Sequence, residues 1–148
     1  MDINTQLKRD EGEVLHVYLD TKGIRTAGVG HNLEAHGIDS PVGTVITQEQ
    51  SDEWLEQDLS RAKTDLEKAG PWVNALDEAR YGVLLNMCFN MGWGNGLHGL
   101  SAFHNTLAKV QSGNYDDAAD AMLESKWAKD VGKRATRLSQ QMKTGEWV

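Results

Sequence analysis

Two runs of β-branched, aromatic and aliphatic residues near the N-terminus, 14–19 and 24–29, predict two β-strands. The segment 20–23 between them predicts a tight turn, because an aspartate can bond its own backbone two residues on and a glycine accepts a positive φ. Gly28 and Gly30, at the end of the second run, leave room for another group to approach the backbone. The pattern therefore predicts a small hairpin with an open backbone at one end.

A helix is predicted on each side of this hairpin. Ahead of it, Ile3 and Leu7 lie four residues apart, which predicts a short amphipathic helix that ends near Glu11. After it, the segment 47–50 matches a capping box, and apolar residues continue at three- and four-residue spacing to about Ala69. This long helix is polar on most of its circumference, which is typical of a connector between two lobes. A helix that packs on the core through a single apolar stripe would show the same pattern.

The later helices are predicted from the same spacing and from breaks at glycine and proline. The apolar residues of the first of them cover more than one face, so this helix is expected at the centre of the larger lobe. The predicted helices are 78–91 with Asp77 as its cap, 101–112 with Ser101 as its cap, 115–124 and 133–143, and the segments 32–44 and 92–96 are predicted loops.

The elements together predict an α+β fold, mostly α, as one domain over residues 1–148. Its small hairpin lobe would cover about 12–46, and its helical lobe about 70–148 together with the N-terminal helix. The net charge of −7, from 15 basic and 22 acidic residues, argues against a nucleic-acid binder, because phosphate contacts need a basic surface. Cys88 is the single cysteine, which excludes an internal disulfide. No segment resembles a signal peptide or a transmembrane helix, so neither self-export nor stable membrane insertion is expected.

Candidate chemistry gathers at the hairpin, where Glu11, Asp20 and Thr26 could face one cleft. A glycoside hydrolase needs two carboxyl groups, one that protonates the leaving sugar oxygen and one, ionised, that activates water or attacks carbon. Glu11, near apolar Val14 and Leu15, is the better candidate for the proton donor, because apolar surroundings keep a carboxyl group protonated. Asp20, on a solvated turn, is the candidate for the ionised partner.

The arrangement of these residues resembles a known family. Glu, eight residues, Asp, five residues and Thr, within D-E-G and Y-L-D-T-K-G-I-R-T-A-G-V-G-H, is similar to the phage-type lysozymes and endolysins of glycoside hydrolase family 24. The resemblance continues in L-L-N-M-C-F-N-M-G, F-H-N-T-L, S-K-W, K-R-A and T-G-E-W, and so spans nearly the whole chain. It implies a lysozyme-like two-lobed fold with a long connecting helix.

The resemblance also implies roles for single residues. Glu11 would be the general acid, Asp20 the water-activating group, and Thr26 a hydroxyl that positions the attacking water. His31 and Arg134 would support the site, with Arg134 near Glu11. The expected saccharide contacts are Asn32, Phe89, Asn90 and Thr106.

Ordinary structural roles compete with several of these assignments. From spacing alone, Glu11 is more simply a solvated acid at a helix end, and the family resemblance reverses that preference. Asp20 can brace its turn with one oxygen and still face water with the other. His31 invites a metal site with His36, His98 and His104, but no pair has the four-residue spacing of a common zinc motif, so a structural hydrogen bond is favoured. We therefore expect neither a metal nor an organic cofactor.

The implied activity is hydrolysis of the β-1,4 bond between N-acetylmuramic acid and N-acetylglucosamine in bacterial peptidoglycan, with inversion at the anomeric carbon. The implied setting is phage-driven host lysis, with a monomer that stays in the host cytoplasm until a separate holin releases it to the wall. A lytic transglycosylase is one rival, although it would not need the second acid. A catalytically silent wall-binding module is the other.

Overall fold

The computed structural model describes residues 1–148, and the contacts among them divide the chain into two units. Residues 3–61 form the hairpin unit, and residues 62–148 with the first two residues form the helical unit. Helix α2 (Gln48–Ala69) contributes to both units. The helix α1 (Ile3–Glu11), which the sequence placed with the helical lobe, falls within the hairpin unit, where its Lys8 pairs with Asp52 of α2 at 2.8 Å.

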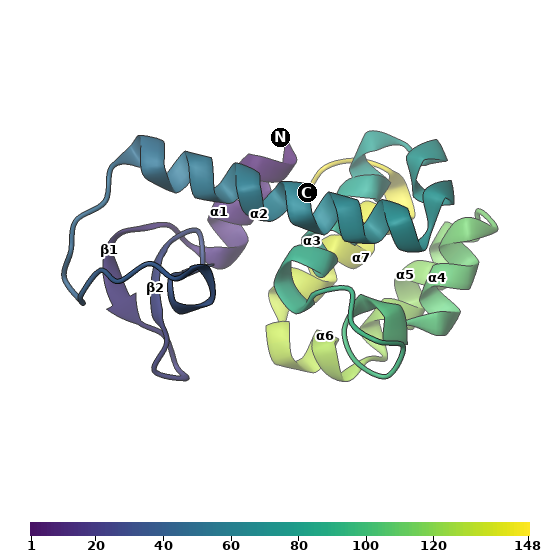
Figure 1. Cartoon of the computed structure of the whole chain (residues 1–148). Helices are drawn as coiled ribbons and strands as arrows, with labels where there is room; N and C mark the ends of the chain where they lie inside the picture. Colours follow the sequence, from purple (N-terminus) through teal and green to yellow (C-terminus); the bar gives the residue numbers. More distant parts are fainter. The chain divides into compact units, whose positions relative to one another are not determined.

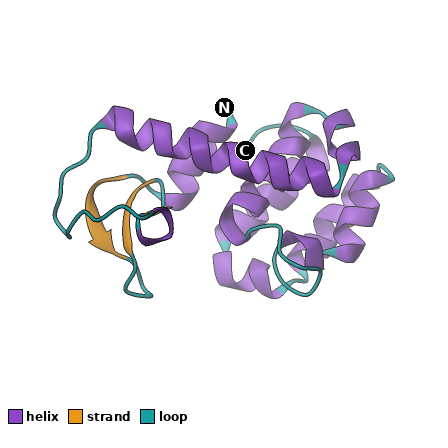
Figure 2. Ribbon diagram, in the orientation of Figure 1, coloured by secondary structure: helices purple, strands orange, loops and turns teal.

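The sheet of the hairpin unit has three antiparallel strands in the order β1 (Val14–Leu19), β2 (Arg25–Gly28) and β3 (His31–Asn32). The expected hairpin is confirmed, with the turn in the predicted place. The structure adds β3, which ends on the first residue of the predicted loop 32–44, and within that loop the short helix η1 (Glu34–His36). Figure 2 shows these strands in orange, all of them in this unit.

The two faces of this sheet have different surroundings. Val17 and Ala27 are fully buried and pack with Leu33 and Trp54 in a small apolar core. Because neighbouring residues on a strand point to opposite faces, Tyr18 and the residues opposite it belong to the other face. That second face carries the row Tyr18, Thr26 and Asn32, which are paired across the three strands.

The helical unit is built around α3 (Glu78–Met91), whose residues 82–88 are all buried. Asp77 caps this helix as predicted, since its side chain accepts a hydrogen bond from the amide of Arg80 at 3.1 Å. Helices α3, α5 and α6 pack on α7, and α4 packs on α5 (Figure 1). The other elements of the unit are η2 (Pro71–Ala75), η3 (Leu100–Ala102), α4 (His104–Gln111), α5 (Tyr115–Leu123), α6 (Lys126–Val131) and α7 (Lys133–Thr144).

One predicted helix start is wrong. The helix expected from Ser101 begins at His104 instead, and Ser101 lies inside η3. The Ser101 hydroxyl accepts a hydrogen bond from the amide of Gly96 at 2.7 Å and donates one to the carbonyl of His98 at 3.1 Å. It therefore holds the glycine-rich loop instead of capping α4. No helix of the chain combines the length and the apolar character needed to span a membrane.

Candidate active site

Glu11 is the last residue of α1, and its carboxylate lies beside the backbone of Gly30. The helix stops because Gly12 takes a positive φ of 78°, while its amide donates to the carbonyl of Lys8 at 3.0 Å. A Cβ placed on Gly30 would lie 3.9 Å from Oε2 of Glu11. The sequence predicted that another group approaches the backbone at Gly30. That group is the half-buried side chain of Glu11, the candidate acid.

Asp20 is held by the turn that follows β1. Its Oδ1 atom accepts hydrogen bonds from the amide of Lys22 at 2.8 Å and from the amide of Ile24 at 2.9 Å. The Asp20 amide in turn donates to the carbonyl of Ile24 at 2.9 Å. Both side-chain bonds use Oδ1, so Oδ2 is left outside the turn. Asp20 thus braces its turn with one oxygen, as the sequence suggested, and the second oxygen can bind another group.

Tyr18 connects the two acids. Its pKa lies above the ordinary value of 10.0, first because of burial, then because of the negative charges of Asp20 and Glu11. Both carboxylates are thus close enough to the phenol for their charges to act on it. Tyr18 therefore lies within electrostatic reach of both candidate acids in the hairpin unit. Sequence analysis missed Tyr18, although its position two residues before Asp20 and opposite Thr26 was a usable signal.

Thr26 lies next to Tyr18 on the same face of the sheet and is almost fully buried. Its hydroxyl donates to the carbonyl of Ile24 at 3.0 Å. Because that bond uses the hydroxyl hydrogen, the Thr26 oxygen presents lone pairs to its other neighbours. It is therefore an acceptor at this site.

A further acid, Glu13, fixes the chain just after Glu11. Its Oε2 atom accepts hydrogen bonds from the Ser51 hydroxyl at 2.7 Å and from Gln48 at 3.0 Å, with the Lys8 ammonium at 3.5 Å. Burial pushes the pKa of Glu13 upward, but these hydrogen bonds and the Lys8 charge outweigh it and hold the pKa below 4.5. Glu13 thus anchors the junction of α1 and β1 to the start of α2. The sequence offered no periodic signal for this role.

His31 and Asn32 have structural partners in the hairpin unit. His31 is 2% exposed, and its Nδ1 lies 2.7 Å from Oδ2 of Asp58 while its ring stacks on Trp54. The predicted structural hydrogen bond of His31 is confirmed. The side-chain oxygen of Asn32 accepts from the amide of Ala35 at 2.9 Å, which secures the start of η1.

The other candidate residues belong to the helical unit. Arg134 is buried and donates from Nε and Nη2 to the Asn86 side-chain oxygen, at 3.0 and 2.7 Å. Asn90, at the end of α3, accepts from the indole of Trp127 at 2.9 Å, and its neighbour Phe89 is half-buried. The expected placement of Arg134 beside Glu11 would join two units and stays a prediction.

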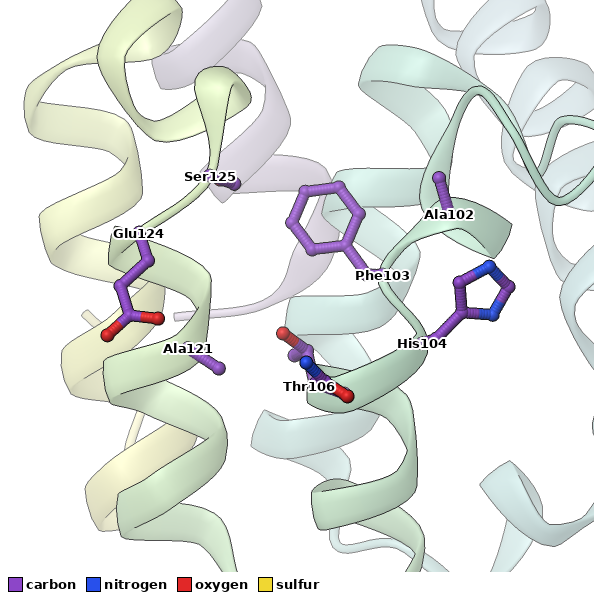
Figure 3. A pocket seen from close by; sticks show the side chains of 8 residues that line it. Ala102, Phe103, His104, Thr106, Ala121, Glu124 and Ser125 are labelled. Carbon is purple, nitrogen blue, oxygen red and sulfur yellow. The ribbon is translucent and has the colours of Figure 1, made fainter.

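Thr106 is buried at the wall of a pocket of about 410 Å³ in the helical unit. Phe103 and Thr106 lie on one side of this pocket, and Ala121 and Glu124 of α5 and its end lie on the other (Figure 3). Both polar and apolar atoms line it, which suits a ligand with hydroxyl groups and a hydrophobic ring face.

The hairpin unit with its candidate acids, and the helical unit, can be compared with known proteins. A family model described as phage lysozyme matches residues 8–144. The chain belongs to the phage lysozyme family. It is therefore a glycoside hydrolase, as the resemblance implied.

Several known proteins are similar in sequence to this phage lysozyme. The endolysin of Salmonella phage P22 is 37% identical over 122 residues, which cover 80% of this chain and 77% of the relative. The probable T4-type lysozyme 1 of Dictyostelium discoideum is 30% identical, over 97% of this chain and 94% of the relative. The pre-baseplate central spike protein Gp5 of Enterobacteria phage T4 is 30% identical over 98% of this chain, and this chain spans 28% of its length.

Proposed function

We propose that this chain hydrolyses the β-1,4 bond between N-acetylmuramic acid and N-acetylglucosamine in bacterial peptidoglycan. Membership of the phage lysozyme family supports this substrate, and one further relative is named peptidoglycan hydrolase gp36, from Pseudomonas phage phiKMV. The observation that supports the mechanism is that, after burial, the negative charges of Asp20 and Glu11 both raise the pKa of Tyr18. One unit of the chain thus supplies both carboxyl groups that glycoside hydrolysis requires.

In the proposed reaction, protonated Glu11 gives its proton to the glycosidic oxygen as the bond from that oxygen to the anomeric carbon breaks. Water attacks the opposite face of the developing oxocarbenium ion. The proton that this water loses passes to Asp20, so that one water molecule is added and the two sugars separate. Return of a proton to Glu11 and its loss from Asp20 complete the cycle, and the anomeric carbon is inverted.

The hydrogen-bond partners of Asp20 and Thr26 suit the orientation of that water. Oδ2 of Asp20 is outside the turn, and the Thr26 oxygen is an acceptor because its hydrogen is bound to the carbonyl of Ile24. A water that donates one hydrogen to each oxygen directs its own lone pair elsewhere, toward the sugar carbon. Pre-orientation of the nucleophile in this way lowers the entropic part of the barrier.

The remaining candidate residues would bind the saccharide or support the site. Asn32, Phe89, Asn90 and Thr106 are the proposed saccharide contacts, and Thr106 already lines a pocket of suitable character. His31 and Arg134 would hold neighbouring elements in place. We further propose a monomer that acts as an endolysin, stays in the host cytoplasm before lysis and reaches the wall through a holin.

Product analysis on purified peptidoglycan tests this function. Wild type should release new reducing ends, and Glu11→Gln should lower the rate by about 10²- to 10⁴-fold, as expected for loss of a general acid. Glu34→Gln is the matched control, because Glu34 is an exposed acid of the same unit that pairs only with Arg25. Release of anhydro-sugars would show a lytic transglycosylase instead. Full activity of Glu11→Gln would overturn the proposed acid.

A further inference from the structure

Three side chains with metal-binding atoms meet in the hairpin unit, away from the mechanism proposed above. His31 of β3, His36 of η1 and Asp58 of α2 each offer one ligand atom, and these three atoms lie within 4.8 Å of one another. The rings of His31 and His36 are stacked, with their centres 4.3 Å apart and their planes 26° apart. Two imidazoles and a carboxylate from three different elements are thus gathered at one point.

Hydrogen bonds already orient both imidazoles. Nδ1 of His36 lies 2.8 Å from the carbonyl oxygen of Asn32. A carbonyl can only accept, so Nδ1 carries the hydrogen and the lone pair of neutral His36 is on Nε2. Histidines that bind metals usually donate their second N–H to a backbone carbonyl or a carboxylate in this way. Nδ1 of His31 lies 2.7 Å from Oδ2 of Asp58, so this contact fixes the His31 ring in the metal-free protein.

We propose that His31, His36 and Asp58 form a binding site for a divalent first-row transition-metal ion. Imidazole nitrogens with one carboxylate oxygen suit zinc, cobalt or nickel, and three protein ligands leave a further position for water. His36 is exposed and Asp58 is partly exposed, so the ion can enter from their side, although His31 is buried. Binding replaces the hydrogen bond between His31 and Asp58, and the proton of that bond leaves to solvent.

The bound ion would link His36 of η1 to Asp58 of α2, two residues that are more than twenty positions apart in sequence. A ligand that binds only the folded state stabilises it in proportion to the logarithm of its concentration over its dissociation constant. The site therefore predicts metal-dependent stability of the hairpin unit. No histidine pair has the helical spacing of a common zinc motif, but that spacing is required only of ligands on one helix, and these three ligands lie on separate elements.

The test is a titration of the tag-free chain with Co²⁺, followed by visible absorption, and with Zn²⁺, followed by calorimetry. We expect one ion per chain, weakened at least about tenfold by His36→Ala, since one of three ligands is lost. The matched control is His16→Ala, because His16 is an exposed histidine of the same unit and should leave the affinity unchanged.

A second readout is thermal unfolding with and without Zn²⁺. Saturating Zn²⁺ should raise the midpoint of wild type by roughly 3 to 8 °C, and His36→Ala should remove that shift. Asp58→Asn, which keeps an acceptor for His31 but removes the charge, should also weaken binding. Absence of stoichiometric binding by wild type, or equal affinity of wild type and His36→Ala, would overturn the site. Neither result depends on the proposed hydrolytic activity.

Discussion

The hairpin unit and the helical unit fix their residues by different physical means. In the hairpin unit, short elements are held by side chains that bond the backbone, such as Asp20 at its turn and Asn32 at η1. In the helical unit, eight of the fourteen residues of α3 are buried, including the whole run 82–88. Polar bonds to the backbone place a carboxylate accurately, whereas apolar burial supplies most of the stability. Function and stability should therefore respond to mutations in different units.

The largest expected effect is that of Asp20→Asn, which should abolish most of the activity and leave the stability nearly unchanged. An asparagine keeps the oxygen that accepts from Lys22 and Ile24, so the turn should survive with little change in stability. The group that takes the proton from water is lost, and the rate of wall hydrolysis should fall by at least about 100-fold. Turbidity assays and thermal unfolding on the same preparation check this. Asp39→Asn, at a fully exposed acid of the same unit, is the control and should change neither quantity.

The opposite pattern is expected for Leu84→Ala in α3. Leu84 is fully buried, so the substitution should lower the free energy of unfolding by about 2–5 kcal/mol. The rate per folded molecule should stay near that of wild type. The control is Leu97→Ala, since Leu97 of the same unit is 80% exposed, and denaturant titration should show little change for it. A lower rate per folded molecule in Leu84→Ala would contradict the assignment of stability to the helical unit and of catalysis to the hairpin unit.

Glu13→Gln tests whether polar anchoring also stabilises the hairpin unit. Loss of the charged acceptor for Ser51, Gln48 and Lys8 should cost about 1–2 kcal/mol at neutral pH. Because folding lowers the pKa of Glu13, its contribution is present above pH 4.5 and is lost as the pH falls below that value. The stability difference between wild type and Glu13→Gln should therefore shrink from pH 7 to pH 3. A difference independent of pH would show that the charge is unimportant.

The smallest expected effect is that of Asn32→Ala, which removes the side-chain acceptor at the start of η1. The cost should be about 0.5–1 kcal/mol, typical of a lost cap. Asn32→Asp keeps that acceptor and should recover the stability. If Asn32 also contacts the saccharide, both variants should raise KM, so steady-state kinetics separate the two roles.

The sequence predicted the elements that have a clear pattern of apolar residues or a capping residue at one end. The hairpin, α2 and α3 were found because β-branched and aromatic runs, a capping threonine and a broad apolar face mark them. Strand β3 and helix α6 are two and six residues long, which is too short for a period to show. Ser101 looked like a cap because only tertiary contacts reveal that its hydroxyl holds a loop.

The candidate site rests on residues that are close in sequence. Glu11, Asp20 and Thr26 lie within one helix-and-hairpin segment, so local pattern brought them together. The pair of His31 and Asp58 joins a strand to a helix, and no local pattern reports such a contact. Tyr18 was hidden for another reason, because an aromatic residue on a strand is already explained by β-propensity.

The central claim is that Glu11 and Asp20 act on one bond from the two sides of a sugar ring. Its most direct test is the distance between the side-chain amide carbon of residue 11 and the carboxyl carbon of Asp20 in a crystal of Glu11→Gln with a bound peptidoglycan fragment. An inverting site with a water between them requires roughly 6.5–9.5 Å across the anomeric carbon. Side chains that flank the same glycosidic bond at that separation would agree with the account. A separation near 5 Å, or an Asp20 directed away from the saccharide, would contradict it.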